Sequence, residues 1–351
     1  MGVAFKSISK VFGDGTVALD GFDLAFESGE FVVLLGPSGS GKTTACRILA
    51  GLEQASGGVI EVDGRDMTGL PPRERGMSMV FQNYALYAHK SVYDNIAYPL
   101  RVRGVAKGEI DGKVRDVARL VQIDALLGRR PRQLSGGEAQ RVAVARALVW
   151  QPNICLMDEP LSNLDAILRL QTRTELKRLH AELGTTFVFV THDQEEAMTL
   201  GTRIAVLNRG RLVQFDTPYA IYHRPANRFV AEFIGRPAMS TIGGAVAGGA
   251  FRSGGFELAV PGRADGPLTL GIRPEHIVLH SGPRDGAIAF RLDVVELVEP
   301  DMLLFVTLGE LSLVVRVKAE AAELERGAEV YLELPTDRFH FFDAETGTRL
   351  P

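Results

Sequence analysis

Two short segments of this sequence carry residues that could hold opposite sides of one phosphate group. The first is a glycine-rich loop that ends in a lysine and a threonine, Gly36-Pro37-Ser38-Gly39-Ser40-Gly41-Lys42-Thr43. Its glycines let backbone N–H groups turn inward, and a helix that begins near Lys42 adds the positive end of its dipole. About ninety residues later, a second segment opens a helix, Leu134-Ser135-Gly136-Gly137-Glu138. One molecule therefore carries two half sites, which would be completed where two copies meet.

The glycine-rich loop predicts nucleotide binding. Lys42 would supply charge to the terminal phosphates, and the Thr43 hydroxyl would be a ligand of Mg²⁺. A chance glycine-rich turn is the alternative. The buried-strand pattern of Phe31–Leu35 before the loop and the helical pattern after it favour the phosphate site, to which we also assign Thr44.

An acidic pair narrows the chemistry. The apolar run 154–157 predicts a strand, and Asp158 and Glu159 follow it directly. This position would place Asp158 beside the metal ion and Glu159 where a water molecule could attack the γ-phosphate. The alternative makes Glu159 a solvated loop residue. The sequence thus predicts a nucleotide-hydrolysing enzyme.

Taken together with Ser135, these motifs and their order resemble the ATP-binding cassette (ABC) family over about residues 3–235. The resemblance implies that Ser135, Gly136, Gly137 and Glu138 contact the γ-phosphate of ATP bound to the loop of a second copy. A homodimer would then enclose two ATP molecules. The alternative is a simple N-cap and turn. Glu138 stands where glutamine is more usual in the family.

The same resemblance gives roles to three further places. Gln82 corresponds to the loop glutamine that senses the metal ion and the attacking water. His192 corresponds to the histidine that contacts the γ-phosphate, although a lone histidine is more often structural. Phe12 corresponds to the aromatic residue that stacks on adenine, with a place in the core as the alternative. The loop that joins the two ATP sites, called the D-loop below, is Ser162-Asn163-Leu164-Asp165, with a helix cap at Ser162 or Asn163 as the alternative.

Apolar strands alternate with helical patterns from about residue 30 to residue 215, which predicts an α/β domain with a mostly parallel sheet. Further strands are expected at 77–81, 187–190 and 204–207, and a long helix between Asp165 and Gly184. We expect the ABC domain at 1–235, with a helical subdomain at about 90–150. Short alternating stretches then predict a small all-β domain at 236–351.

The second domain, with Gly271-Ile272-Arg273-Pro274-Glu275-His276-Ile277 at its centre, resembles the β-barrel (OB-like, TOBE) appendage of sugar and glycerol-phosphate importers. The resemblance implies an ATPase subunit that energises import of a sugar, polyol or glycerol-phosphate. Its partners would be two membrane-spanning permease subunits and, indirectly, a solute-binding protein. An iron, sulfate or polyamine importer is the alternative, and a soluble ABC protein without membrane subunits is a more distant one.

Composition limits the other possibilities. The chain has 351 residues, too many for a single core, and a formal net charge of −4 with scattered basic residues, so we expect no nucleic-acid partner. Its two cysteines, Cys46 and Cys155, lie in apolar segments, which suggests buried thiols in a reducing compartment. No apolar run reaches the length of a membrane span. We therefore expect a peripheral protein at the cytoplasmic face of the inner membrane.

Overall fold

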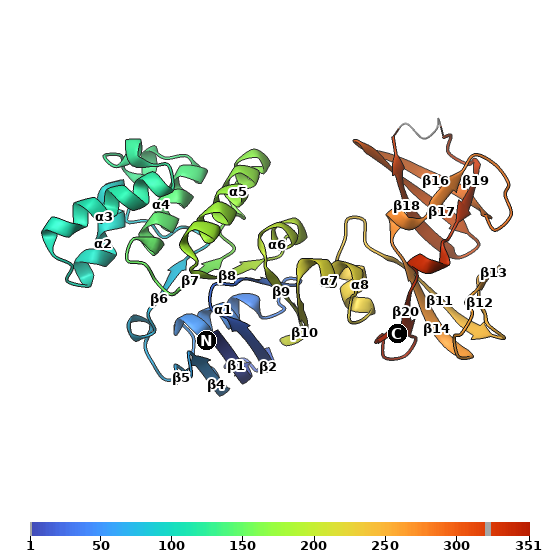
Figure 1. The fold of residues 1–351 in the computed structure, drawn as a ribbon, viewed down its shortest axis with the longest axis horizontal. Coiled ribbons are helices and arrows are strands. Elements are labelled where there is room, and N and C mark those ends of the chain that lie inside the picture. Colours follow the sequence, from blue (N-terminus) through green and yellow to red (C-terminus); the bar gives the residue numbers. More distant parts are fainter. Residues whose placement is uncertain (1, 320–323) are drawn as a thin grey trace. The chain divides into compact units, whose positions relative to one another are not determined.

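The chain folds into two compact units, 1–218 and 219–351, in a computed structural model that describes residues 2–319 and 324–351 (Figure 1). A six-stranded sheet forms the centre of the first unit, in the order β10-β9-β3-β8-β7-β6. All neighbours except β10 and β9 are parallel. These strands are β3 (Phe31–Leu35), β6 (Met77–Val80), β7 (Ile154–Asp158), β8 (Thr186–Thr191), β9 (Arg203–Asn208) and β10 (Arg211–Asp216).

The buried strands of this sheet agree with the expected ranges to within one or two residues. Every residue of β3, β7 and β8 is buried, which is why each strand reads as a continuous apolar run. The glycine-rich loop, Glu159 and His192 follow β3, β7 and β8 respectively. Because the strands are parallel, their carboxyl ends bring these three segments to one edge of the sheet.

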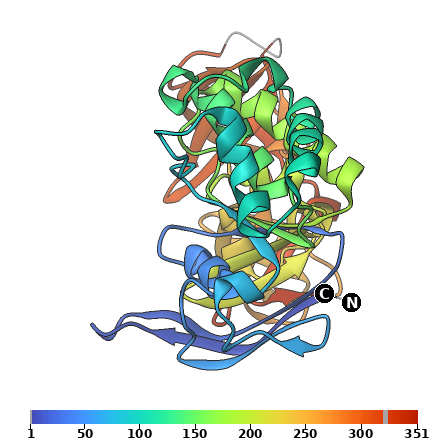
Figure 2. The same cartoon turned by 90° about the vertical axis from the view of Figure 1, so that its left-hand side faces the viewer.

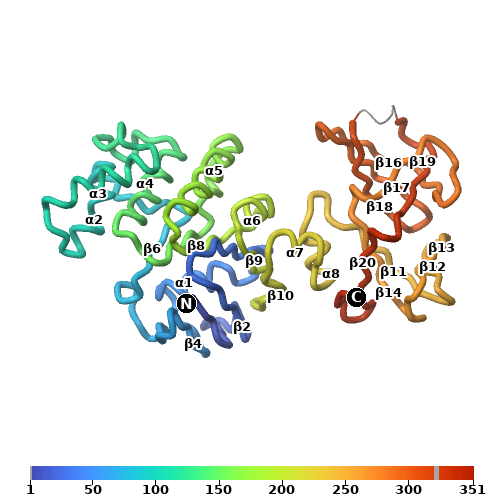
Figure 3. Tube along the Cα trace, in the orientation of Figure 1, coloured from blue at the N-terminus to red at the C-terminus, as the bar shows by residue number. Residues whose placement is uncertain are grey.

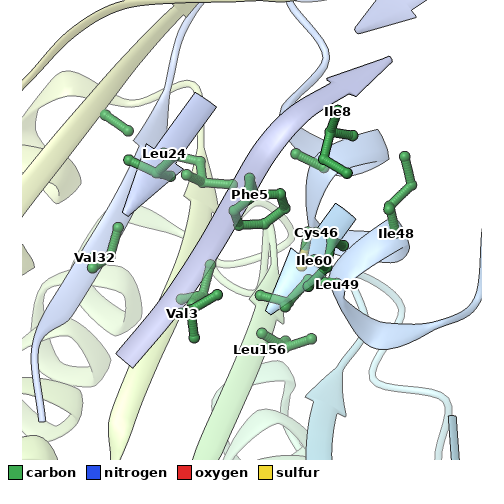
Figure 4. Close-up of a cluster of buried hydrophobic side chains, with 14 of the residues drawn as sticks. Val3, Phe5, Ile8, Leu24, Val32, Cys46, Ile48, Leu49, Ile60 and Leu156 are labelled. Atoms are coloured by element: carbon green, nitrogen blue, oxygen red, sulfur yellow. The ribbon is translucent and has the colours of Figure 1, made fainter. Parts of the chain in front are cut away.

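An antiparallel sheet that the sequence did not predict completes the first unit, in the order β2-β1-β4-β5. Its strands are β1 (Gly2–Val11), β2 (Val17–Glu27), β4 (Gly57–Val62) and β5 (Arg65–Asp66). The core lies between this sheet, α1 (Lys42–Ala50) and the parallel sheet. Phe5 and Leu24 reach this core from the antiparallel sheet, Leu49 reaches it from α1, and Leu156 from the parallel sheet (Figure 4). Cys46 and Cys155 are both buried free thiols, as expected.

Helices leave the central sheet after β6 and return at β7, as the chain trace shows (Figure 3). They are α2 (Val92–Val102), α3 (Lys107–Leu120) and α4 (Gly136–Leu148), with three-residue turns η2 (Asp124–Leu126) and η3 (Pro131–Gln133). In Figure 2 this teal and green segment lies at the opposite side of the first unit from the blue N-terminal strands. Two more helices cover the sheet, α5 (Ala166–Leu183) and α6 (Gln194–Leu200), while η1 (Pro72–Glu74) precedes β6.

The second unit opens with two short helices, α7 (Pro218–His223) and α8 (Arg228–Phe233). Arg273 is buried in this unit and donates to the carbonyl oxygens of Tyr222 and Ile234, both at 2.6 Å. These bonds attach the helices to the strands that follow. The compact unit therefore begins near residue 219, before the domain boundary at 235/236 that the sequence suggested.

Two antiparallel sheets enclose the core of the second unit, in the orders β13-β12-β11-β14-β20-β21 and β15-β19-β16-β17-β18. The first contains β11 (Ser240–Ala247), β12 (Ala250–Ser253), β13 (Phe256–Ala259), β14 (Gly266–Ile272), β20 (His340–Asp343) and β21 (Arg349–Leu350). The second contains β15 (Val278–His280), β16 (Ile288–Val298), β17 (Asp301–Leu308), β18 (Leu311–Lys318) and β19 (Glu329–Glu333). Short turns η4 (Pro274–His276) and η5 (Thr336–Arg338) join them.

Among the residues described, no helix has both the length and the apolar character that crossing a bilayer requires.

Candidate functional site

A pocket of about 600 Å³ lies at the carboxyl edge of the parallel sheet. It brings together the glycine-rich loop, Phe12, Glu159 and His192, which the sequence analysis selected separately. The lining residues are Phe12, Thr16, Val17, Ala18, Ser38, Gly39, Gly41, Lys42, Thr43, Thr44, Glu159 and His192. One concave site therefore contains an aromatic ring, a phosphate loop and a candidate general base.

The phosphate loop is held in a shape that requires glycine at Gly41. This residue has φ 98°, and a Cβ atom there would lie 2.4 Å from the carbonyl oxygen of Ala18. Gly41 is the N-cap of α1, and no side chain caps the N–H groups in the first turn of this helix, all of whose residues the structure describes. Those groups and the helix dipole are available to an anion in the pocket.

Lys42 is already oriented along this loop. Its Nζ donates to the carbonyl oxygens of Gly36 and Pro37, both at 2.9 Å, and lies 3.5 Å from Ser40 Oγ. The side chain is only 5% exposed, and burial lowers the pKa of its ammonium group, against the charges of Glu159 and Asp158. The cation is thus fixed in position by the protein, with little conformational freedom left to lose on binding a phosphate.

Thr43 and Asp158 provide two adjacent oxygen atoms that fit a magnesium ion. Thr43 Oγ1 donates to Asp158 Oδ1 at 2.9 Å, and Arg47 Nε lies 3.8 Å from Asp158 Oδ2. Burial raises the pKa of the Asp158 carboxyl, while the Thr43 hydrogen bond and Arg47 oppose this shift. A buried carboxylate with a hydroxyl beside it is suited to a cation that keeps several phosphate or water ligands.

Glu159 projects into the pocket from an unusual backbone conformation. Its φ is 45°, in the left-handed region, and its N–H donates to the carbonyl oxygen of Val190 at 3.1 Å. Such conformations cost free energy in residues other than glycine and recur at functional sites. His192 Nδ1 lies 3.4 Å from Glu159 Oε2, with the imidazole largely exposed. The acid and the histidine therefore face the same space.

Gln82 lies outside the pocket lining and is attached to the D-loop. Its side-chain Nε2 donates to Ser162 Oγ at 3.3 Å, and its backbone carbonyl oxygen accepts from Asn163 Nδ2 at 2.9 Å. The helix cap that the sequence allowed at Ser162 or Asn163 is instead formed by Asp165, whose Oδ1 accepts from the Leu168 N–H. Leu164 is buried. The D-loop thus contacts Gln82 and also begins α5.

The segment 134–138 forms the start of α4 and contributes none of the described residues that line the pocket. Ser135 is the N-cap, and its Oγ accepts from the Glu138 N–H at 3.3 Å. Glu138 Oε2 accepts from the Ser135 N–H at 2.7 Å, and this bond lowers the pKa of its carboxyl. Both the capping role and an outward-facing helix N-terminus are therefore present, because a capping box leaves other N–H groups of the first turn available.

Gly136 and Gly137 serve close packing. A Cβ atom on Gly136 would lie 3.2 Å from a methyl group of Leu164, and one on Gly137 would lie 3.3 Å from a methyl group of Leu168. The start of α4 consequently lies against the D-loop and the first turn of α5. Sequence reasoning gave these glycines a role toward phosphate only.

Phe12 is 38% exposed and lines the pocket, so it is not a core residue. Lys10 Nζ lies 5.0 Å from the centre of its ring. Thr16, Val17 and Ala18 line the same part of the pocket, and sequence reasoning missed them. No motif marks these residues, and their closeness to Phe12 along the chain is the signal that could have identified them.

A lysine-bearing phosphate loop after β3 and an acidic pair at the end of β7, two parallel strands of one sheet with β8 between them, define a P-loop ATPase. Comparison with known proteins shows to which family of P-loop ATPases the chain belongs. The ABC transporter family profile matches residues 19–162, and the TOBE domain profile matches residues 270–342. The chain is 45% identical over 356 aligned positions to the sn-glycerol-3-phosphate import ATP-binding protein UgpC of Salmonella typhi, covering 99% of both chains. The UgpC protein of Escherichia coli O1:K1 / APEC gives the same identity and coverage.

Two solved structures resemble the cassette. CbiO1 of Clostridium perfringens, part of the ABC transporter complex cbiONQ, has a TM-score of 0.58 at 26% identity, covering 62% of this chain and 89% of CbiO1. The cassette MJ0796, solved as a dimer in a post-hydrolysis state with ADP and Pi, has a TM-score of 0.55 at 31% identity, covering 62% of this chain and 98% of that one. The chain belongs to the ATP-binding subunits of ABC transporters and carries an ATPase cassette and a TOBE domain.

Proposed function

We propose that this chain hydrolyses ATP to energise an ABC importer, with a glycerol-phosphate, sugar or polyol as the solute. The observation that carries the proposal is the full-length similarity to import ATP-binding proteins, joined to a pocket that contains Lys42, Thr43 and Glu159. The protein would act at the cytoplasmic face of the inner membrane, beneath two permease subunits that a solute-binding protein supplies.

In this proposal each pocket residue has one task. Phe12 stacks on adenine, the loop from Gly36 to Thr44 holds the phosphates, and Lys42 stabilises their charge. Glu159 accepts a proton from the attacking water, and His192 holds the γ-phosphate beside it. Thr43 and Asp158 would hold Mg²⁺, with Gln82 as the third protein ligand that the family resemblance implies, and the bound ion would supply positive charge beside the phosphates.

The proposal needs two copies of the chain. Ser135 and the helix N-terminus behind it contribute nothing to their own pocket, yet they present a capped, glycine-rich turn of the kind that binds anions. Ser135 would complete the pocket of a second copy, so that two ATP molecules lie at the seam of a homodimer. ATP binding would then close the dimer and hydrolysis would open it, because only the closed state has the full set of contacts.

The dimer can be tested with two matched serine caps. Ser135 caps α4, and Ser91 caps α2 in the same way, its Oγ accepting from the Asp94 N–H at 3.0 Å. Serine-to-alanine substitution should cost about 1 kcal/mol of folding stability at either cap. In a Glu159→Gln background with ATP and Mg²⁺, only Ser135→Ala should weaken dimerisation, measured by analytical ultracentrifugation. A monomeric Glu159→Gln protein, or equal effects of Ser135→Ala and Ser91→Ala, would contradict the proposal.

The solute class can be tested in cells. In a strain that lacks its own sn-glycerol-3-phosphate import ATPase but retains the permeases, we expect this chain to restore uptake of the radiolabelled solute. A Glu159→Gln chain expressed at the same level is the control and should restore none. Restored uptake of a sugar by the corresponding sugar-importer strain, without any glycerol-phosphate uptake, would move the assignment to that class.

A further inference from the structure

Two arginines one turn apart on α5 face the acidic residues at the beginning of α6. Arg173 Nη1 donates to Glu195 Oε1 at 2.8 Å; the Arg173 side chain is 11% exposed and the Glu195 side chain 66%. Arg169 Nε lies 3.8 Å from Glu196 Oε1; the Arg169 side chain is 35% exposed, whereas Glu196 is only 5% exposed. Burying an ion pair seldom adds folding stability. The carboxyl is the buried member of the Arg169–Glu196 pair, called the inner pair below, and the guanidinium is the buried member of the Arg173–Glu195 pair, called the outer pair. What each pair contacts therefore decides its role.

Arg169 contacts the D-loop directly. Its Nη2 donates to the carbonyl oxygen of Leu164 at 2.9 Å, and its Nη1 lies 4.0 Å from Asp193 Oδ2. Leu164 is the D-loop residue whose methyl group lies against the position of Gly136 at the start of α4. One guanidinium group thus touches the D-loop on one side and the segment that follows His192 on the other.

Glu196 holds the segment that carries His192. Thr191 Oγ1 donates to Glu196 Oε2 at 2.5 Å, and the same hydroxyl accepts from the Asp193 N–H at 2.9 Å. Both neighbours of His192 are therefore fixed by one buried carboxyl and one hydroxyl. Burial raises the pKa of this carboxyl, and the Thr191 bond and the Arg169 charge oppose the shift. The imidazole, exposed and 3.4 Å from Glu159, depends on this segment for its position.

A small polar cavity lies behind the proposed general base. Its volume is about 50 Å³, and Glu159, Ser162, Arg169 and Glu196 contribute to its walls. The Nε of Arg169 is buried without a hydrogen-bond partner among the described residues. A polar cavity of this size can hold a water molecule. The Arg169–Glu196 pair therefore lies next to Glu159, although neither residue lines the nucleotide pocket itself.

We infer that Arg169 and Glu196 are positioning residues for ATP hydrolysis, which join the D-loop to the His192 segment. Contact of the D-loop with a second copy would then set His192 against Glu159 and the γ-phosphate. The inference rests on the proposed function, in which Glu159 and His192 act on ATP and the D-loop lies at the dimer seam. It predicts an effect on turnover and none on ATP binding.

The test compares the inner pair with the outer pair in the purified full-length chain. Glu196→Gln and Arg169→Met should each lower kcat about 10-fold and leave KM for ATP within about twofold, because misplaced catalytic groups slow the chemical step. The double variant should be little slower than either single variant, since the two residues act as a unit. Arg169→Lys should recover part of the rate. Glu195→Gln is the matched control on α6 and should keep the wild-type kcat within about twofold, since it changes only the outer pair, whose carboxyl is exposed to solvent.

The outcomes distinguish a positioning role of Arg169 and Glu196 from a purely structural role, and they test the proposed ATPase function separately. A wild-type kcat in Glu196→Gln and Arg169→Met, or an equal loss in Glu195→Gln, overturns the inference. Thermal unfolding identifies any variant that does not fold, and Arg169→Lys then takes the place of Arg169→Met. Glu159→Gln is run in parallel. Full ATPase activity in Glu159→Gln overturns the proposed function, whereas its loss together with a normal Glu196→Gln overturns the positioning role alone.

Discussion

Replacing Glu159 by glutamine should lower the ATPase turnover of the purified chain by about 100-fold or more, which is the usual contribution of a general base. The amide is isosteric with the carboxyl and can keep the left-handed backbone at this position, but it cannot accept a proton from the attacking water. ATP binding should change little, because Lys42 and the phosphate loop are untouched. Steady-state phosphate release and equilibrium binding of a fluorescent ATP analogue measure the two effects separately.

A second glutamate-to-glutamine substitution, away from the pocket, shows whether the loss of turnover is specific to Glu159. Glu182 lies at the end of α5, pairs with Arg178 and is 44% exposed. Glu182→Gln removes the same charge far from the pocket and should leave kcat unchanged. Substantial remaining turnover in Glu159→Gln would refute its role as the base. Equal losses in both variants would point to a general effect of the net charge.

The central sheet could be predicted because its strands are buried on both faces. Phe31–Leu35 and the neighbouring runs are continuously apolar, and no surface position interrupts the pattern. α5 could be predicted because Asp165 and Gly184 mark its two ends. The N-terminal antiparallel sheet escaped prediction, because its strands have one exposed face and β1 shifts register several times against β2. Those shifts break the two-residue alternation that identifies such strands.

Within the site, local motifs were predictable and contacts between distant segments were not. The loop from Gly36 to Thr43 carries its chemistry in consecutive residues, so its position in the pocket could be expected. Gln82 and Ser162 are 80 residues apart, and only folding brings the amide to the hydroxyl. Arg169 lies in a helix whose polar residues resemble those of any exposed surface. Nothing in the sequence distinguishes it from Arg173, whereas their partners in the structure do.

Replacing Lys42 by alanine should weaken ATP binding roughly 10- to 100-fold, the value of about one charge-assisted hydrogen bond to phosphate. The ammonium group is held by the Gly36 and Pro37 carbonyl oxygens, so the wild-type protein pays little entropy when phosphate arrives. Lys42→Arg should not restore binding, because a planar guanidinium presents its donors in a fork that differs from the point charge of an ammonium group. Titration calorimetry with ATP in the presence of Mg²⁺ gives the affinities.

A measurement of folding stability shows whether the loss of ATP affinity in Lys42→Ala results from unfolding. Burial lowers the pKa of Lys42, so the charged form is disfavoured in the folded chain, and this contribution reduces stability at neutral pH. Lys42→Ala removes that penalty together with the lysine hydrogen bonds, and we expect its melting temperature to stay close to the wild-type value or to rise. Lys177→Ala, an exposed position on α5, should change neither affinity nor stability. Wild-type ATP affinity in Lys42→Ala would remove the phosphate loop from the proposed mechanism, because no other lysine or arginine is among the described pocket residues.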